Sequence, residues 1–204
     1  MKKSTKVLVT AALASVVFTG CNQYEKSLKI LPNEIAQANE CISTNKEYEK
    51  DCYDLISYKN SIALLRLGIK EYGQGKYTDA YQLYTLAKQR GNFYANALLS
   101  ELYFKGRGVK QNQEMGLKLL EDVEDVDPIA AYKLAFYYLS KKENADALEL
   151  LEYAAKNNVK DAQLKLSKIY AEGKITKANP EKSKALQKAY EDKTNSFISK
   201  IYGL

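Results

Sequence analysis

The sequence predicts an all-α fold, a solenoid built from repeated helical hairpins. From residue 61 onward, apolar side chains recur every three or four positions, as on one face of a helix, and no stretch alternates as a strand does. An Ala-x-x-x-Leu-small pattern also returns at intervals of 32, 35 and 32 residues. A period of this length is typical of arrays whose unit is one pair of helices. The pattern consists of Ala63, Leu67 and Gly68; Ala95, Leu99 and Ser100; Ala130, Leu134 and Ala135; and Ala162, Leu166 and Ser167.

Residues 1–20 are interpreted as a signal peptide. Three lysines precede an uncharged run over residues 7–18, which is shorter than the roughly 20 residues that a membrane-spanning helix needs. The run ends in "FTGC", which resembles the lipoprotein signal box of bacteria, with Phe18 in place of the usual Leu or Val. The resemblance implies that Cys21 is acylated and becomes the first residue of the mature chain. The alternative is an ordinary secretory signal followed by an incidental cysteine.

Acylation of Cys21 would anchor the protein in the cell envelope. Several acyl chains, each contributing about 0.8 kcal/mol per buried methylene, make a stable anchor where one chain is marginal. Asn22 follows the cysteine, whereas lipoproteins that stay at the inner membrane tend to have Asp there. We therefore expect a protein at the outer membrane that faces the periplasm, with residues 21–33 as a short tether.

The composition argues against a nucleic-acid partner. The formal charge of +6 falls to +3 without the three lysines of residues 1–20, and lysines alternate with glutamates along the rest of the chain. Binding to phosphates needs basic residues clustered on one face, whereas this pattern is typical of a solvated helical surface. With 204 residues, 46% of them hydrophobic, the chain is long enough for one domain with its own core.

Cys41 and Cys52 are expected to form a disulfide, because they remain as an even pair in an oxidising compartment once Cys21 is acylated. One continuous helix would separate them by about 16 Å, but a disulfide needs Cα atoms less than about 7 Å apart. The chain must therefore reverse, and Thr44 followed by Glu47 predicts a capping box for the second arm. Residues 34–60 then form a disulfide-linked helical hairpin. The alternative is two free thiols in an apolar core.

Residues 61–194 are predicted to form four units of two helices each. In three units a tyrosine follows the leucine of the pattern by four positions, and Gly91 and Asn158 suit the left-handed turn that ends a helix. Residues 195–204 carry apolar side chains at helical spacing and are predicted to cap the C-terminal end of the array. The three tyrosines are Tyr103, Tyr138 and Tyr170.

These units resemble tetratricopeptide repeats, and more particularly the Sel-one-like subfamily. The loop of the second unit carries the family's Tyr-x-x-Gly-x-Gly-Val pattern, although Asn112 stands where the family usually has Asp. The fourth unit keeps Tyr170 and Gly173 but has Ile175 for the second glycine. The resemblance implies a right-handed α-solenoid that binds proteins through the first helix of each unit. The loop pattern consists of Tyr103, Gly106, Gly108 and Val109.

The sequence predicts no enzyme, cofactor or metal site. It contains no histidine, which excludes Ser-His-Asp and Cys-His arrangements and most zinc sites. Ser43 and Lys46 match the Ser-x-x-Lys element of penicillin-binding enzymes, but the companion Ser-Asp-Asn and Lys-Thr-Gly elements are missing. Paired carboxylates remain an open alternative, since no pair stands out among the many acids.

A protein-binding groove is predicted on the first helices. An exposed apolar and aromatic face of this kind marks a protein partner. The alternative is that the N-terminal hairpin folds into the groove and makes these side chains core. The residues expected to bind are Leu65, Ile69, Tyr72, Tyr94, Glu101, Phe104, Lys105, Tyr132, Phe136, Leu139 and Lys168.

The resemblance also suggests a function. Small Sel-one-like lipoproteins are known to neutralise phospholipase toxins delivered to the periplasm by type VI secretion. We therefore expect a non-enzymatic, lipid-anchored binding module, and favour an immunity protein that binds one such toxin. The alternative is an envelope scaffold that holds components of outer-membrane or cell-wall assembly.

Overall fold

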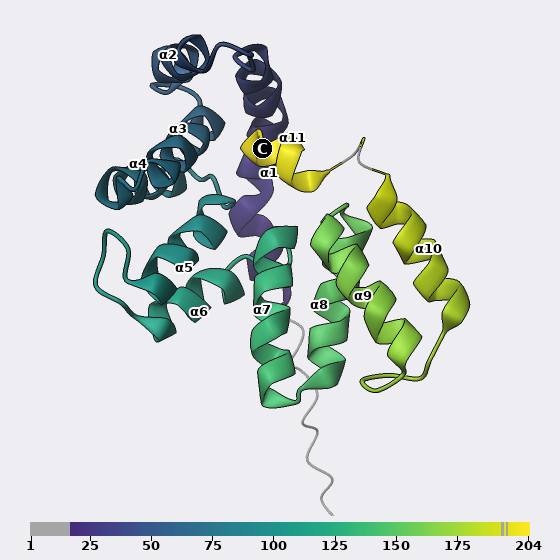
Figure 1. The fold of residues 1–204 in the computed structure, drawn as a ribbon. Helices are drawn as coiled ribbons and strands as arrows, with labels where there is room; N and C mark the ends of the chain where they lie inside the picture. The colour runs from purple at the N-terminus through teal and green to yellow at the C-terminus, as the bar shows by residue number, and fades with distance from the viewer. Residues whose placement is uncertain (1–16, 193, 195) are drawn as a thin grey trace, which may run out of the picture.

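The computed structural model describes the backbone of residues 17–192, 194 and 196–204 and the side chains from Tyr24 onward. The all-α prediction is confirmed, because this part of the chain forms eleven α-helices and no strand (Figure 1). Most of the predicted signal peptide, and the side chain of Cys21, lie outside the described residues. The helices are α1 Val17–Glu40, α2 Lys46–Ile56, α3 Ser61–Gly73, α4 Tyr77–Gln89, α5 Ala95–Lys105, α6 Gln113–Glu121, α7 Pro128–Lys141, α8 Asn144–Lys156, α9 Lys160–Glu172, α10 Pro180–Glu191 and α11 Phe197–Tyr202.

Helices α3 to α10 form four antiparallel hairpins that follow one another along an arc (Figure 1). The hairpins pair α3 with α4, α5 with α6, α7 with α8, and α9 with α10. Gly68 shows why the pattern needs a small residue, since a Cβ at this position would clash with the ring of Tyr84. Asp127 and Asn179 cap helices that begin with a proline, a combination that favours a helix start.

The loop of the second unit has the backbone that its glycines predict. Gly106 and Gly108 adopt φ angles of 63° and 69°, in the left-handed region that favours glycine. A Cβ on Gly108 would also clash with the backbone of Tyr77. Asn112, in place of the family's Asp, still caps α6 by accepting a hydrogen bond from the amide of Met115 at 3.0 Å.

The segment expected to be a tether is part of a helix. Helix α1 continues through residues 21–33, with Pro32 inside it, and buries Leu31 and Ile35 in the core. A proline inside a helix costs about 3 kcal/mol, and burying two such apolar side chains offsets a cost of this size. Polar contacts also join α1 to α3, because the side chain of Asn60 donates to the carbonyl of Glu34 at 2.9 Å.

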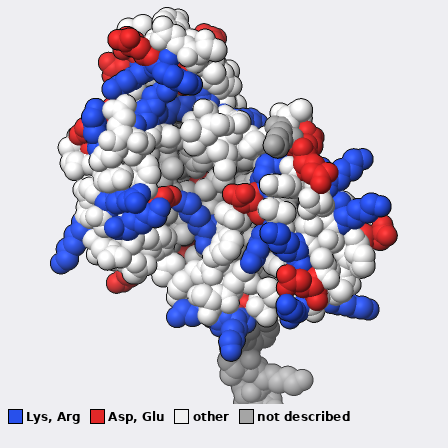
Figure 2. All heavy atoms as spheres, in the orientation of Figure 1, with Lys and Arg blue, Asp and Glu red and all other residues white. Residues whose placement is uncertain are grey.

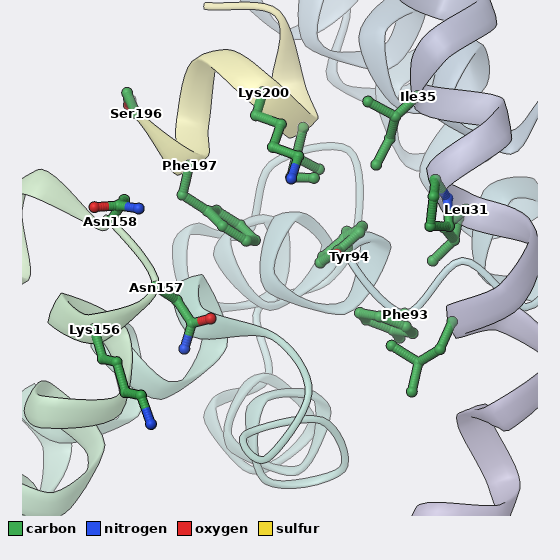
Figure 3. Close-up of a pocket in the computed structure, with 13 residues that line it drawn as sticks. Leu31, Ile35, Phe93, Tyr94, Lys156, Asn157, Asn158, Ser196, Phe197 and Lys200 are labelled. Atoms are coloured by element: carbon green, nitrogen blue, oxygen red, sulfur yellow. The ribbon is translucent and has the colours of Figure 1, made fainter. Parts of the chain in front are cut away.

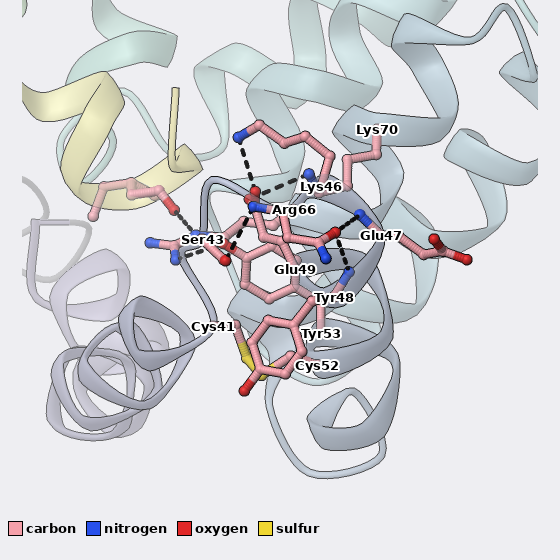
Figure 4. Close-up of polar contacts among 12 residues, drawn as sticks. Cys41, Ser43, Lys46, Glu47, Tyr48, Glu49, Cys52, Tyr53, Arg66 and Lys70 are labelled. Atoms are coloured by element: carbon pink, nitrogen blue, oxygen red, sulfur yellow. Dashed lines mark hydrogen bonds and ion pairs between the residues drawn. A yellow bond between two sulfur atoms is a disulfide. The ribbon is translucent and has the colours of Figure 1, made fainter.

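The N-terminal hairpin has the predicted disulfide. Cys41 and Cys52 are bonded with their Cα atoms 5.5 Å apart, and the chain reverses between α1 and α2 (Figure 4). The predicted cap was wrong by one residue. Asn45, not Thr44, caps α2, since its side chain accepts from the amides of Glu47 and Tyr48 at 3.1 and 3.2 Å. Asn and Thr both serve as caps, so a sequence that contains both does not decide between them.

The C-terminal segment does not cap the last unit. Helix α11 packs mainly against α3 at the other end of the array, on the inner side of the arc (Figure 1). Ile201 and Tyr202 are buried there, whereas α10 has no buried residue. The side chain of Arg66 on α3 donates to the carbonyls of Lys200 and Ile201 at 3.1 and 3.3 Å. The first and the last described helices, α1 and α11, therefore both pack against α3.

Candidate protein-binding site

The inner side of the arc is partly covered by the chain's own ends. Helices α1 and α11 lie against α3, and two of the predicted binding residues belong to this covered region. Leu65 is 0% exposed and is a core residue, so its prediction as a binding residue was wrong. Tyr94 is half-buried, with its ring 4.4 Å from that of Phe93 and 5.7 Å from that of Phe197. The alternative that the N-terminal hairpin covers the groove holds here only in part, because α1 of that hairpin and the C-terminal helix α11 both lie against α3.

Phe104 points away from the inner side. Its ring lies against Gly116 of α6, where a Cβ would collide with it. The residue therefore packs the two helices of its own hairpin together, but it is half-buried and its part in binding stays a prediction. Periodicity alone placed Phe104 near the edge of the inner face, where small rotations of a helix decide which neighbour a side chain meets.

A polar cluster links α3, α5 and α7 around Glu101. Its carboxylate accepts from the Tyr72 hydroxyl at 3.0 Å and pairs with Lys105 and Lys133 at 2.7 and 3.0 Å. Burial alone would raise the pKa of Glu101, but Lys133, Lys105 and Tyr72 outweigh it and lower the pKa to about 2. Arg107 brings a further positive charge to the cluster, because its guanidinium donates to the hydroxyl of Tyr72. The cluster fixes the spacing of three consecutive units.

An exposed aromatic and basic surface continues from this cluster onto α7 and α9. We call it the inner-face patch and define it as Tyr132, Phe136, Lys165 and Lys168. The rings of Tyr132 and Phe136 meet edge to face at 5.0 Å, and the ammonium of Lys165 lies 5.3 Å from the centre of the Phe136 ring. Phe136 is nevertheless 41% exposed, and Lys168 is also exposed. A lysine over one ring of an aromatic pair, with the exposed Lys168 one turn further along α9, suits a partner that presents acidic and apolar side chains together.

The other predicted binding residues flank this surface. Ile69 and Leu139 are half-buried, and both pack against the core at its edge. Lys133 and Lys165 were missed as site residues. Each directly precedes a pattern leucine, Leu134 or Leu166, so the sequence marked both as part of a solvated helical surface. Only the arrangement of α5, α7 and α9 shows that they face Glu101 and Phe136.

The face in view in Figure 2 carries more Lys and Arg than Asp and Glu side chains. The acids are scattered among the bases, as the alternating sequence predicts. A partner that approaches this face therefore meets a mildly positive surface, which favours one with acidic groups.

A cavity of about 380 Å³ lies where the chain's two ends approach the array (Figure 3). Leu28, Leu31, Pro32 and Ile35 of α1 form one wall, and Phe93 and Tyr94 the floor. Helix α11 closes another side and is tied to the end of α8, because the amide of Phe197 donates to the carbonyl of Asn158 at 3.1 Å. The remaining lining residues are Lys156, Asn157, Asn158, Ser196, Phe197, Lys200 and Ile201.

A second cavity of about 380 Å³ lies between α8 and the residues that connect α6 to α7. Two tyrosines, Tyr138 and Tyr153, and several carboxylates line it. Burial raises the pKa of Glu124, and the nearby charges of Glu121, Asp125 and Glu149 raise it further. Four carboxylates therefore line this cavity, and the raised pKa of Glu124 contributes to the pH dependence of stability.

Comparison with known proteins supports the fold directly. No protein-family model and no curated protein matches the chain. The crystal structure of a Sel1 repeat protein from Oxalobacter formigenes matches 80% of this chain and 70% of its own, with a TM-score of 0.69 and 26% identity. The chain has the Sel1 repeat fold.

A second Sel1-like structure agrees. The crystal structure of c5321, a protective antigen present in uropathogenic Escherichia coli strains displaying an SLR fold, matches 82% of this chain with a TM-score of 0.58 and 23% identity. This chain covers 39% of that longer protein. The likeness shows that the same hairpin array occurs within a longer chain.

The Ser-x-x-Lys element of this Sel1-like chain does not form a joint site. The hydroxyl of Ser43 accepts from the amide of Asn45 at 3.2 Å, whereas the ammonium of Lys46 pairs with Glu49 at 2.9 Å (Figure 4). Both residues therefore serve the start of α2. Within the described part of the chain, no group of three or more His, Cys, Asp and Glu residues is arranged to hold a metal ion. In that same part, no helix combines the length and the apolar character needed to cross a membrane.

Proposed function

We propose that this protein is a protein-binding module and that its partner docks on the inner-face patch. The Sel1 repeat fold supports a role in protein interaction. The single observation that carries the choice of surface is Phe136, an aromatic side chain that stays 41% exposed between Tyr132 and Lys165. Large aromatic residues that remain accessible beside charged ones are frequent anchors of protein interfaces.

The chemistry of the patch defines the partner. The aromatic pair offers apolar contact area, and among the described residues neither Lys165 nor Lys168 forms an ion pair. Lys105 and Lys133 share the single carboxylate of Glu101 nearby, which leaves an excess of positive charge. The partner should therefore place one apolar side chain against Phe136 and carboxylates on either side of it.

We further propose that the partner is a toxin and that this protein is the immunity protein that binds it. The lipoprotein-like "FTGC" of residues 18–21 supports a location at the membrane, where a lipid-cleaving toxin acts. The resemblance to Sel-one-like lipoproteins supports the toxin class, a phospholipase delivered by type VI secretion. The second candidate, an envelope scaffold, uses the same surface but binds resident envelope proteins.

Capture experiments with two matched variants test the proposal. Phe136→Ser removes the central ring from the patch, and Leu86→Ser removes a leucine of similar exposure, 37%, from α4. Purified wild-type and variant chains would be immobilised and exposed to secreted and envelope fractions. The immunity role is supported if the wild type and Leu86→Ser both capture a single hydrolase in a one-to-one ratio and Phe136→Ser does not. Resident envelope proteins with the same dependence support the scaffold, and equal capture by both variants contradicts the surface.

A further inference from the structure

We propose that the cavity between α1 and α11 binds a single fatty-acyl chain that ends in an anionic group. This site is distinct from the inner-face patch and goes beyond the proposed protein-binding function. Its volume of about 380 Å³ lies within the range of ligand-binding pockets in proteins. Four separate parts of the chain contribute to it, namely α1, the residues before α5, the end of α8, and α11.

Apolar side chains form most of the walls. Leu31 and Phe93 are almost completely buried and shape the interior, whereas Leu28 is 49% exposed at the opening. Phe197 closes the α11 side with its ring against Tyr94. A hydrocarbon chain that enters this space leaves water and covers the exposed surface of Leu28, both of which favour binding.

Positive charge lies at the cavity without a counter-charge. Lys156 and Lys200 are lining residues, and none of the described residues that line the cavity is Asp or Glu. Among the described residues, neither ammonium forms an ion pair. Figure 3 shows Lys200 reaching from α11 toward the space between Tyr94 and the α1 residues Leu31 and Ile35. An anionic group placed there gains a charge-assisted hydrogen bond beside the apolar walls.

The apolar walls and the two lysines together select the ligand. A small polar anion would gain nothing from the leucines and phenylalanines, and a neutral hydrocarbon would leave the lysines unused. A peptide segment would bring backbone N–H and C=O groups against the apolar walls formed by α1, Phe93 and Phe197, which is unfavourable. The carbonyl of Asn158 is already occupied by the amide of Phe197. One acyl chain with one anionic end suits both the walls and the lysines.

Titration calorimetry with dodecanoate below its micelle concentration tests the proposal. The wild-type protein should bind one molecule. Lys200→Met should weaken binding by at least about tenfold, the usual effect of losing a charged hydrogen bond, and Leu28→Trp should abolish it by filling the opening. The matched control is Lys184→Met, which removes an exposed lysine of α10 and should leave binding unchanged.

Further ligands separate the possible sources of the acyl chain. Competition by lysophosphatidylglycerol would identify an anionic phospholipid, whereas dodecanoate binding without such competition would identify a free fatty acid. The proposal would be overturned if dodecanol bound as tightly as dodecanoate. It would also be overturned if Leu28→Trp bound dodecanoate as tightly as the wild type does. Absence of dodecanoate binding, or tighter binding of an acidic peptide to the same site, would overturn it as well. Circular dichroism of each variant shows that the helical fold is retained.

Discussion

Replacing Asp127 with asparagine should remove a large part of the pH dependence of stability. Asp127 precedes α7 and is fully buried, with one carboxylate oxygen accepting from the amide of Ile129 at 2.9 Å. The other oxygen is buried and accepts no hydrogen bond from any described residue. Burial raises the pKa of Asp127 from 3.8 to about 7, although the amides of Ile129 and Ala130 and the charge of Lys133 oppose the shift.

The sign and size follow from this shift. A carboxyl whose pKa is higher in the folded state binds its proton more tightly there, so stability is greatest at low pH and falls as pH rises through the folded pKa. Between pH 5 and pH 8 the folded protein should lose about 3 kcal/mol of unfolding free energy from this group, since one pKa unit corresponds to about 1.36 kcal/mol. Asparagine keeps the capping oxygen and carries no charge, so the unfolding free energy of Asp127→Asn should not show this decline between pH 5 and pH 8.

Urea denaturation at pH 5 and pH 8 measures the effect. The matched control is Asp79→Asn, which removes an exposed aspartate from the first turn of α4. The control should follow the wild type, whereas the curve of Asp127→Asn should be flatter by about 3 kcal/mol over this range. Glu101, whose pKa is about 2, loses its stabilising charge only at lower pH and does not interfere. Parallel curves for the wild type and Asp127→Asn would refute the reasoning.

Three further perturbations test the fold. Replacing Cys41 and Cys52 together with serine should lower the unfolding free energy by about 3 kcal/mol, because the disulfide closes a short loop, and an unchanged urea midpoint would contradict this. Gly108→Ala should lower the unfolding free energy by more than about 1 kcal/mol, because position 108 has a φ of 69° and a Cβ there would clash with the backbone of Tyr77. Gly73→Ala, which has open space in α3, should be neutral or stabilising. Equal melting temperatures for the two variants in thermal denaturation would contradict this expectation. Arg66→Met should speed amide hydrogen exchange in α11, because Arg66 holds the carbonyls of Lys200 and Ile201, and exchange as slow as in Lys70→Met would argue against that role.

The contacts of Arg66 explain how α11 is held. Arg66 is buried, and its guanidinium meets neutral oxygens, namely the Tyr53 hydroxyl, the Asn39 side chain and the last carbonyls of α11 (Figure 4). The C-terminal end of a helix carries partial negative charge, so these carbonyls suit a cation. A buried charge without good partners is costly, and α11 therefore stabilises α3 as much as α3 holds α11.

The parts of the fold that depend on neighbouring residues were predictable. Helical periodicity, the spacing of the alanine pattern and the glycines of the second loop are local signals, and the structure has the helices and turns that they indicate. The disulfide was also predictable, because Cys41 and Cys52 remain as an even pair once Cys21 is set aside, and a bond between them requires the chain to reverse.

The parts that depend on packing between distant segments were not predictable. The same apolar spacing in residues 197–202 fits a cap on α10 or a helix against α3, and only the shape of the arc decides between them. Leu65 is core because α1, α2, α4 and α11 all pack against α3, which no pattern within α3 reports. The pairing of Lys133 with Glu101 likewise requires the relative rotation of α5 and α7.

Site-specific crosslinking in cells tests the central claim, that the inner-face patch binds a protein, most directly. A photoreactive phenylalanine would replace Phe136 in one strain and Leu86 in another, since the two side chains have similar exposure on different helices. If the inner-face patch binds a protein, a discrete crosslinked adduct should form from position 136 and none from position 86. No adduct at position 136, or the same adducts at both positions, would contradict it.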